Sequence, residues 1–178
     1  MKKTLYFLAF VFLPYFLNAQ TGFVSVRYSN DVTSWSVDAG GSGEIRERYS
    51  NDATSWSIDM GSASGTISTR YSNAYGDWNI EIGGQTYELS SRYSGSFTDW
   101  TLSGGDLSES VSISTRYSND YSSWRIEGQN IEMNTRYSGD YTDWSISGCS
   151  SSTNTGVRAA AAFLPVFVAA VQQKGLTR

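Results

Sequence analysis

The chain has 178 residues, with 13 basic and 17 acidic side chains, no histidine and one cysteine. A net charge of −4 disfavours nucleic acid as a partner. The absence of histidine excludes imidazole catalysis and the usual zinc and copper sites, and one thiol excludes an intrachain disulfide framework. Composition therefore predicts one domain at most, without catalytic residues, a metal site or a cofactor, and we expect no enzyme.

The N-terminus, residues 1–19, is typical of a secretory signal peptide. Lys2 and Lys3 supply the positive charge, residues 5–17 are mostly apolar, and Ala19 precedes a predicted cleavage site. Cleavage would leave a mature chain with 11 basic against 17 acidic residues, a net charge of −6. We therefore expect a secreted, periplasmic or cell-surface protein.

A repeat with a period of 20 to 24 residues dominates the rest of the chain. Arg-Tyr-Ser occurs six times, and a tryptophan follows each arginine by eight positions. The arginines are Arg27, Arg48, Arg70, Arg92, Arg116 and Arg136, and the tryptophans are Trp35, Trp56, Trp78, Trp100, Trp124 and Trp144. Such regular spacing indicates six copies of one structural unit.

Each repeat is predicted to form a β-hairpin. Apolar and polar residues alternate with period two, so that Ile67, Thr69 and Tyr71 share one face of a strand and Trp78 and Ile80 share one face of the next. The position after each Arg-Tyr-Ser is asparagine or glycine, the residues that most readily adopt positive φ. The hairpin domain is expected to span residues 20–148, and its tyrosines are expected on the apolar face.

Twelve antiparallel strands predict an all-β fold, either a closed, shallow barrel or a β-solenoid. After a Ser/Thr/Gly linker over 149–156, residues 157–178 are predicted to form a hydrophobic helical segment that fills or caps the barrel. Pro165 is expected to kink or break this helix near Leu164. The strands are too short for an outer-membrane barrel, so no integral membrane protein is expected once the signal is removed.

Repeats such as Arg116-Tyr117-Ser118-Asn119-Asp120-Tyr121-Ser122-Ser123-Trp124 resemble those of the β-flower proteins. The resemblance covers about residues 23–148. It implies a radially symmetric barrel of hairpin petals around an apolar channel, with no established biochemical activity. A looser architectural similarity to tubby-like barrels, which enclose a hydrophobic C-terminal helix and bind phosphoinositides, lacks any matching lipid-site motif.

The six arginines lie in register and would form a belt that could grip an anion. An acid follows four of them by eleven positions, which predicts internal ion pairs for Arg27, Arg48, Arg70 and Arg116 with Asp38, Asp59, Glu81 and Glu127. Arg92 and Arg136 have no acid at that position, so they are candidate ligand-binding residues.

The tryptophans precede an aliphatic residue by two positions on the same strand face, which indicates core residues. A further series lies inside the hairpin loops and contains Val32, Ala53, Tyr75, Phe97, Tyr121 and Tyr141. Its four aromatic members, Tyr75, Phe97, Tyr121 and Tyr141, are the other candidate ligand-binding residues, and packing of each loop on its own hairpin is the alternative.

These patterns predict a secreted, non-enzymatic binding or interaction module; they do not identify its ligand, for which a lipid or another anionic or surface ligand is a candidate. A structural cell-envelope protein and a carbohydrate-binding repeat protein are the alternatives, so lipid and polysaccharide are the candidate partners. The lone Cys149 is interpreted as a small, partly buried residue.

Overall fold

The computed structural model describes residues 21–29, 31–72, 74–93 and 96–175, so the predicted signal peptide lies outside the described residues. The described chain forms twelve β-strands followed by one α-helix. They are β1 (Thr21–Val26), β2 (Ser34–Asp38), β3 (Ser42–Glu47), β4 (Ser55–Asp59), β5 (Ser64–Thr69), β6 (Asp77–Ile82), β7 (Gln85–Ser91), β8 (Asp99–Gly104), β9 (Val111–Thr115), β10 (Ser123–Ile126), β11 (Ile131–Thr135), β12 (Asp143–Ser147) and α1 (Thr155–Lys174).

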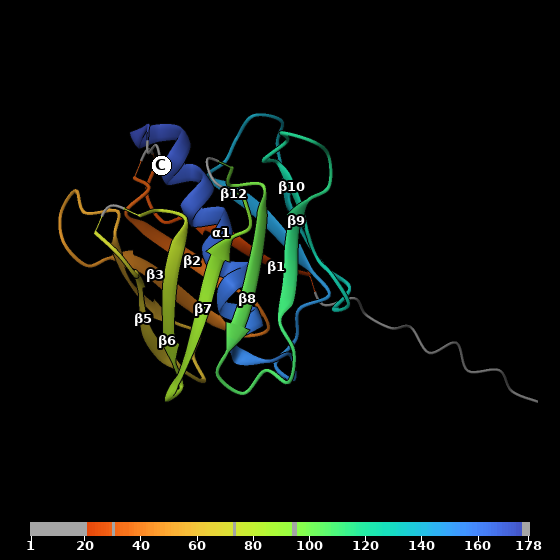
Figure 1. Cartoon of the computed structure of the whole chain (residues 1–178). Helices are drawn as coiled ribbons and strands as arrows, with labels where there is room; N and C mark the ends of the chain where they lie inside the picture. Colours follow the sequence, from red (N-terminus) through yellow and green to blue (C-terminus); the bar gives the residue numbers. More distant parts are fainter. Residues whose placement is uncertain (1–20, 30, 73, 94–95, 176–178) are drawn as a thin grey trace, which may run out of the picture.

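The strands form a closed antiparallel barrel in which each strand pairs with its neighbours in sequence (Figure 1). Closure is made by β1, which pairs with β2 on one side and with β12 on the other. In the β1–β12 pair, Val24 lies opposite Trp144 and Phe23 lies opposite Ser145. The predicted barrel is therefore confirmed, and no solenoid is needed to account for the repeats.

The inner face of the barrel carries the tryptophans and the aliphatic residues two positions after them. All six tryptophans are 0% or 1% exposed, and Val37, Ile58, Ile80, Leu102, Ile126 and Ile146 are 0% to 2% exposed. The period-two alternation places these side chains inside and the intervening polar ones outside. The core assignment of the tryptophans is correct.

Helix α1 fills the barrel rather than lying across one end (Figure 1). Its residues 156–170 are all buried. Phe163 makes an edge-to-face contact with Trp78 at 4.8 Å between ring centroids, and Phe167 does so with Trp100 at 5.4 Å. In length and composition the helix could cross a membrane, but its apolar surface faces the barrel wall.

Pro165 lies inside one continuous helix, so the predicted break near Leu164 is wrong. A proline removes its own N–H bond and crowds the carbonyl of residue i−4, here that of Ala161. The helix is packed against the barrel on every side around this position, and these contacts hold it as a single element. The helix also begins at Thr155, inside the stretch predicted to be a linker.

Both ends of α1 are tied to the barrel. At the N-terminus, Asn154 Oδ1 accepts hydrogen bonds from the backbone N–H groups of Gly156 and Val157, while its Nδ2 donates to Asp106. Asp106 also accepts a hydrogen bond from the buried Tyr87 hydroxyl, at 2.5 Å. At the C-terminus, Lys174 pairs with the carboxylate of Glu47, the last residue of β3. The helix thus runs between the two ends of the barrel.

Candidate functional site

Six similar loops gather at one end of the barrel. Each connects an odd-numbered strand to the even-numbered strand that follows it, and in an antiparallel barrel all such connections lie at the same end. Each loop starts with Arg-Tyr-Ser, and we call the six loops, residues 27–33, 48–54, 70–76, 92–98, 116–122 and 136–142, the Arg-Tyr rim.

The backbone of these loops is held by a repeated turn. The tyrosine carbonyl accepts a hydrogen bond from the N–H three residues later, at 2.9 to 3.2 Å in all six loops. Asn51, Asn119 and Gly139 have φ of 62°, 58° and 76°, as predicted for the position after Arg-Tyr-Ser. The corresponding positions 30, 73 and 95 lie outside the described residues.

Each loop is also fastened to the core by its tryptophan. The indole Nε1–H donates to the carbonyl three residues earlier, at 2.8 or 2.9 Å in all six repeats. In four loops an aspartate accepts hydrogen bonds from the backbone and the hydroxyl two residues later, as Asp31 does from Thr33. Those hydrogen bonds lower the pKa of Asp31, so it stays ionised. The rim is thus built of preorganised loops.

The tyrosines of Arg-Tyr-Ser are on the surface, so their expected place on the apolar strand face is wrong. Each odd strand ends before the arginine, as β5 ends at Thr69, and the turn that begins at the tyrosine carries its ring away from the barrel. The six rings are 58% to 65% exposed and are the exposed large hydrophobic side chains among the described residues: Tyr28, Tyr49, Tyr71, Tyr93, Tyr117 and Tyr137.

The loop aromatics predicted as candidate ligand contacts pack against the core, as the alternative interpretation expected. Phe97 is 7% exposed, stacks on Trp100 with ring centroids 6.0 Å apart and meets Phe167 at 5.0 Å. Three others are half-buried and lean on their own tryptophans at 6.2 to 6.4 Å, namely Tyr75, Tyr121 and Tyr141. These four rings pack between the loops and the core, whereas the exposed rings are the tyrosines of Arg-Tyr-Ser.

The arginines form ion pairs, but with other acids than the predicted ones. Arg27 pairs with Glu44 at 2.6 Å, Arg70 with Glu88 at 3.0 Å and Arg116 with Glu132 at 3.3 Å. The prediction placed the acid eleven positions after each arginine, on the next strand of the same hairpin. In the structure each of these arginine side chains instead passes over that strand and reaches a glutamate on the strand after it. Arg48, predicted to pair with Asp59, lies over the Tyr49 ring at 5.5 Å.

The two arginines left without a predicted acid differ from each other. Arg136 Nε lies 3.6 Å from Asp143 Oδ1, an ion pair without a hydrogen bond. Arg92 is exposed and has no ion pair with any described residue.

The C-terminal turn of α1 emerges within the Arg-Tyr rim. A hollow of about 340 Å³ lies between this turn and the sixth loop, and Tyr141, Ala169 and Gln172 are among its lining residues. Gln172 and Gln173, in the last turn of the helix, line this hollow and are exposed. The rim therefore has a polar centre.

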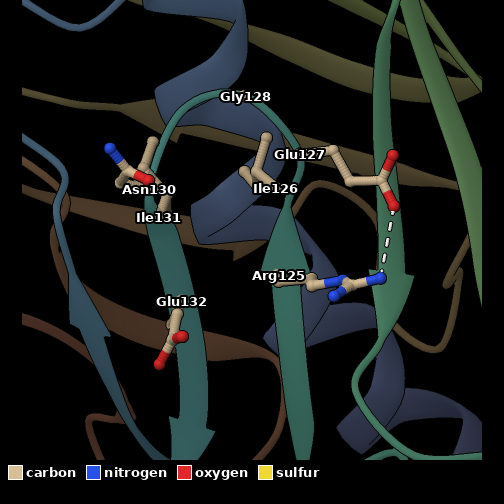
Figure 2. A pocket seen from close by; sticks show the side chains of 7 residues that line it. All are labelled: Arg125, Ile126, Glu127, Gly128, Asn130, Ile131 and Glu132. Atoms are coloured by element: carbon tan, nitrogen blue, oxygen red, sulfur yellow. Dashed lines mark hydrogen bonds and ion pairs between the residues drawn. The ribbon is translucent and has the colours of Figure 1, made fainter.

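A second hollow, of about 320 Å³, lies on the β10–β11 hairpin (Figure 2). Arg125 and Glu127, on the β10 side of the hairpin, form an ion pair with each other, and Glu132 pairs with Arg116. Since these charged groups already have partners and Ile126 is buried, the hollow offers little to a ligand. Among the described residues, no three Cys, Asp or Glu side chains are grouped to hold a metal ion.

Comparison with family models finds no match, and searches of curated proteins and solved structures find none either. The resemblance to β-flower repeats therefore stays a prediction. The candidate site depends on the geometry of the chain itself, in which the exposed Arg-Tyr pairs of the rim are the most regular surface feature.

A sequence signal could have located the exposed tyrosines. Each tyrosine stands two positions before a residue suited to positive φ, and a strand does not continue into such a turn. Applying the period-two rule only up to the arginine would have placed the tyrosine in the loop.

Proposed function

We propose that this protein is a non-enzymatic binding module that contacts a polysaccharide through its Arg-Tyr rim. The observation that carries the proposal is the set of six tyrosines, 58% to 65% exposed, on six preorganised loops at one end of the barrel. The barrel interior is occupied by α1, so a ligand must bind on the outside.

The composition of the rim supports binding. Tyrosine presents a large amphipathic surface at a low cost in conformational entropy, and neighbouring serine, asparagine and glycine provide adaptable hydrogen bonds. Tyrosine and arginine are also enriched where interfaces concentrate their binding energy. Because each loop is fixed by its turn and by its tryptophan, little order must be gained on binding.

The choice of polysaccharide over lipid depends on which apolar side chains are exposed. Surfaces that dock on membranes usually insert tryptophan, phenylalanine or leucine. The exposed large hydrophobic residues of the described chain are all tyrosines, so among the described residues no tryptophan, phenylalanine or leucine is exposed for insertion into the acyl chains. A hydrated polymer whose sugar rings can place their C–H faces on the tyrosine rings fits this surface better than the interior of a bilayer.

The test replaces all six rim tyrosines by serine and, in a matched variant, by phenylalanine. Binding of the mature protein is measured by affinity electrophoresis in gels containing dextran, dextran sulfate or polygalacturonate, beside vesicles of phosphatidylcholine and phosphatidylglycerol. We expect the serine variant to lose polysaccharide binding and the phenylalanine variant to keep most of it, with unchanged unfolding in both. Binding by vesicles alone, or equal binding by the serine variant, would refute the proposal.

A further inference from the structure

The ion pairs of the rim arginines alternate around the barrel. Arg27, Arg70 and Arg116, in the first, third and fifth loops, each reach a glutamate on the second strand along, and the partners are Glu44 on β3, Glu88 on β7 and Glu132 on β11. The side chains of these glutamates are 37%, 46% and 43% exposed, so the pairs cover the outer wall.

The barrel register explains this alternation. Each of the three glutamates lies opposite the residue that follows a tryptophan, as Glu44 lies opposite Ser36 and Glu88 opposite Asn79. In the remaining three repeats the residue in that position has no charge. It is Thr66 opposite Ser57, Ser112 opposite Thr101, and Phe23 opposite Ser145.

The arginines of the second, fourth and sixth loops consequently lack a glutamate. Arg48 lies over the Tyr49 ring, neither Arg48 nor Arg92 has an ion pair with a described residue, and Arg136 has the 3.6 Å ion pair with Asp143. All three are exposed. The rim thus presents three guanidinium groups that no glutamate pairs with, and they alternate with three that do have a glutamate partner.

We propose that Arg48, Arg92 and Arg136 make the Arg-Tyr rim selective for an anionic polysaccharide, one that carries carboxylate or sulfate groups. A guanidinium group binds such planar or tetrahedral oxyanions through paired N–H donors. The tyrosine next to each arginine supplies a flat contact for the adjoining sugar. One exposed site of this kind is weak, but a polymer that engages several of them at once binds by avidity. The inference rests on the proposed function, because it specifies the ligand of the same rim.

The deciding experiment compares two variants of the mature protein. R48Q/R92Q/R136Q removes the three guanidinium groups that lack a glutamate partner. The matched control, R27Q/R70Q/R116Q combined with E44Q/E88Q/E132Q, removes three guanidinium groups at the same motif position together with their glutamates, so its net charge is unchanged. Circular dichroism and urea unfolding check that both variants fold as the parent does.

Binding is measured to polygalacturonate, dextran sulfate and neutral dextran at low and high salt. We expect R48Q/R92Q/R136Q to lose about tenfold or more in affinity for the two anionic polymers and to lose the salt dependence of binding. The control should stay within about threefold of the parent. Neither variant should change binding to dextran.

Several results would overturn the inference, and they separate it from the proposed function. Equal losses in the two variants would mean that all six arginines act alike. Equal binding of dextran and polygalacturonate by the parent would leave the rim as a polysaccharide site without charge selectivity. If the parent binds only phosphatidylglycerol vesicles, or no polysaccharide at all, both proposals fail together.

Discussion

Replacement of Phe163 by alanine tests whether α1 is the packed centre of the barrel. Phe163 is fully buried and meets Trp78 edge-to-face at 4.8 Å, with Trp56 and Phe167 at 6.3 and 6.2 Å. Alanine is the best helix former, so the change acts through packing and leaves helix propensity intact.

The magnitude follows from the contacts that are lost. A buried phenylalanine replaced by alanine costs about 3 to 5 kcal/mol in unfolding free energy, which includes the cavity left behind. For a chain of this length, that loss lowers the melting temperature by roughly 6 to 20 °C. It also represents a large share of the about 5 to 15 kcal/mol typical of a folded domain.

The assay is urea unfolding, monitored by tryptophan fluorescence and by circular dichroism. The exposed Gln172, on the same helix, is replaced by alanine as the control and should change stability by less than about 0.5 kcal/mol. A loss below about 1 kcal/mol in Phe163→Ala, with both probes unfolding together, would mean that the helix is not packed against the wall, and the account of the core given above would be refuted.

Three further predictions concern titratable groups. Burial and then the hydrogen bond to Asp106 raise the pKa of Tyr87 to about 12. A titration followed by absorbance at 295 nm should therefore show one tyrosine that ionises later than the others, and this step should be missing in Tyr87→Phe. The stability that the protonated hydroxyl contributes is full below the ordinary pKa of about 10 and should be lost as the pH rises towards 12. Burial raises the pKa of the Cys149 thiol, so a thiol reagent at pH 8 should label the unfolded but not the native protein; rapid native labelling would contradict its burial. Hydrogen bonds within the turns lower the pKa of three rim aspartates, Asp31, Asp52 and Asp120. Their contribution to stability is full above the ordinary pKa of 3.8 and is lost as the pH falls through the lowered values. This acid-induced loss of stability should be smaller in the variant in which all three are changed to asparagine.

The barrel could be predicted because the repeat carries two strong local signals. Trp78 and Ile80, at alternate positions, identify a strand with one apolar face, and the residue suited to positive φ marks the turn before it. Six such hairpins can bury their apolar faces either in a closed barrel or in a stacked solenoid. The apolar C-terminal segment favoured the barrel, because a helix could fill its interior. The structure confirms each of these steps.

The candidate site was only partly predictable. Continuing the strand alternation through Arg70 placed Tyr71 on the apolar face, whereas the turn begins at that tyrosine and exposes its ring. The ring of Phe97, taken as a ligand contact, is in the core because the loop folds back over its tryptophan and α1. A loop side chain gives no periodic signal, so its direction follows from the turn that contains it.

Local interactions within one repeat specify its strands, its inward tryptophans and the asparagine or glycine of its turn, so these features can be read from the sequence. The ion pairs of the arginines depend instead on contacts between strands of different repeats. Arg27 and Glu44 are seventeen residues apart and meet across β2, and Phe23 occupies the register position where Arg136 would otherwise have a glutamate only because β12 closes on β1. Pairing between strands sets such contacts, and the register of a closed barrel is a property of all twelve strands together.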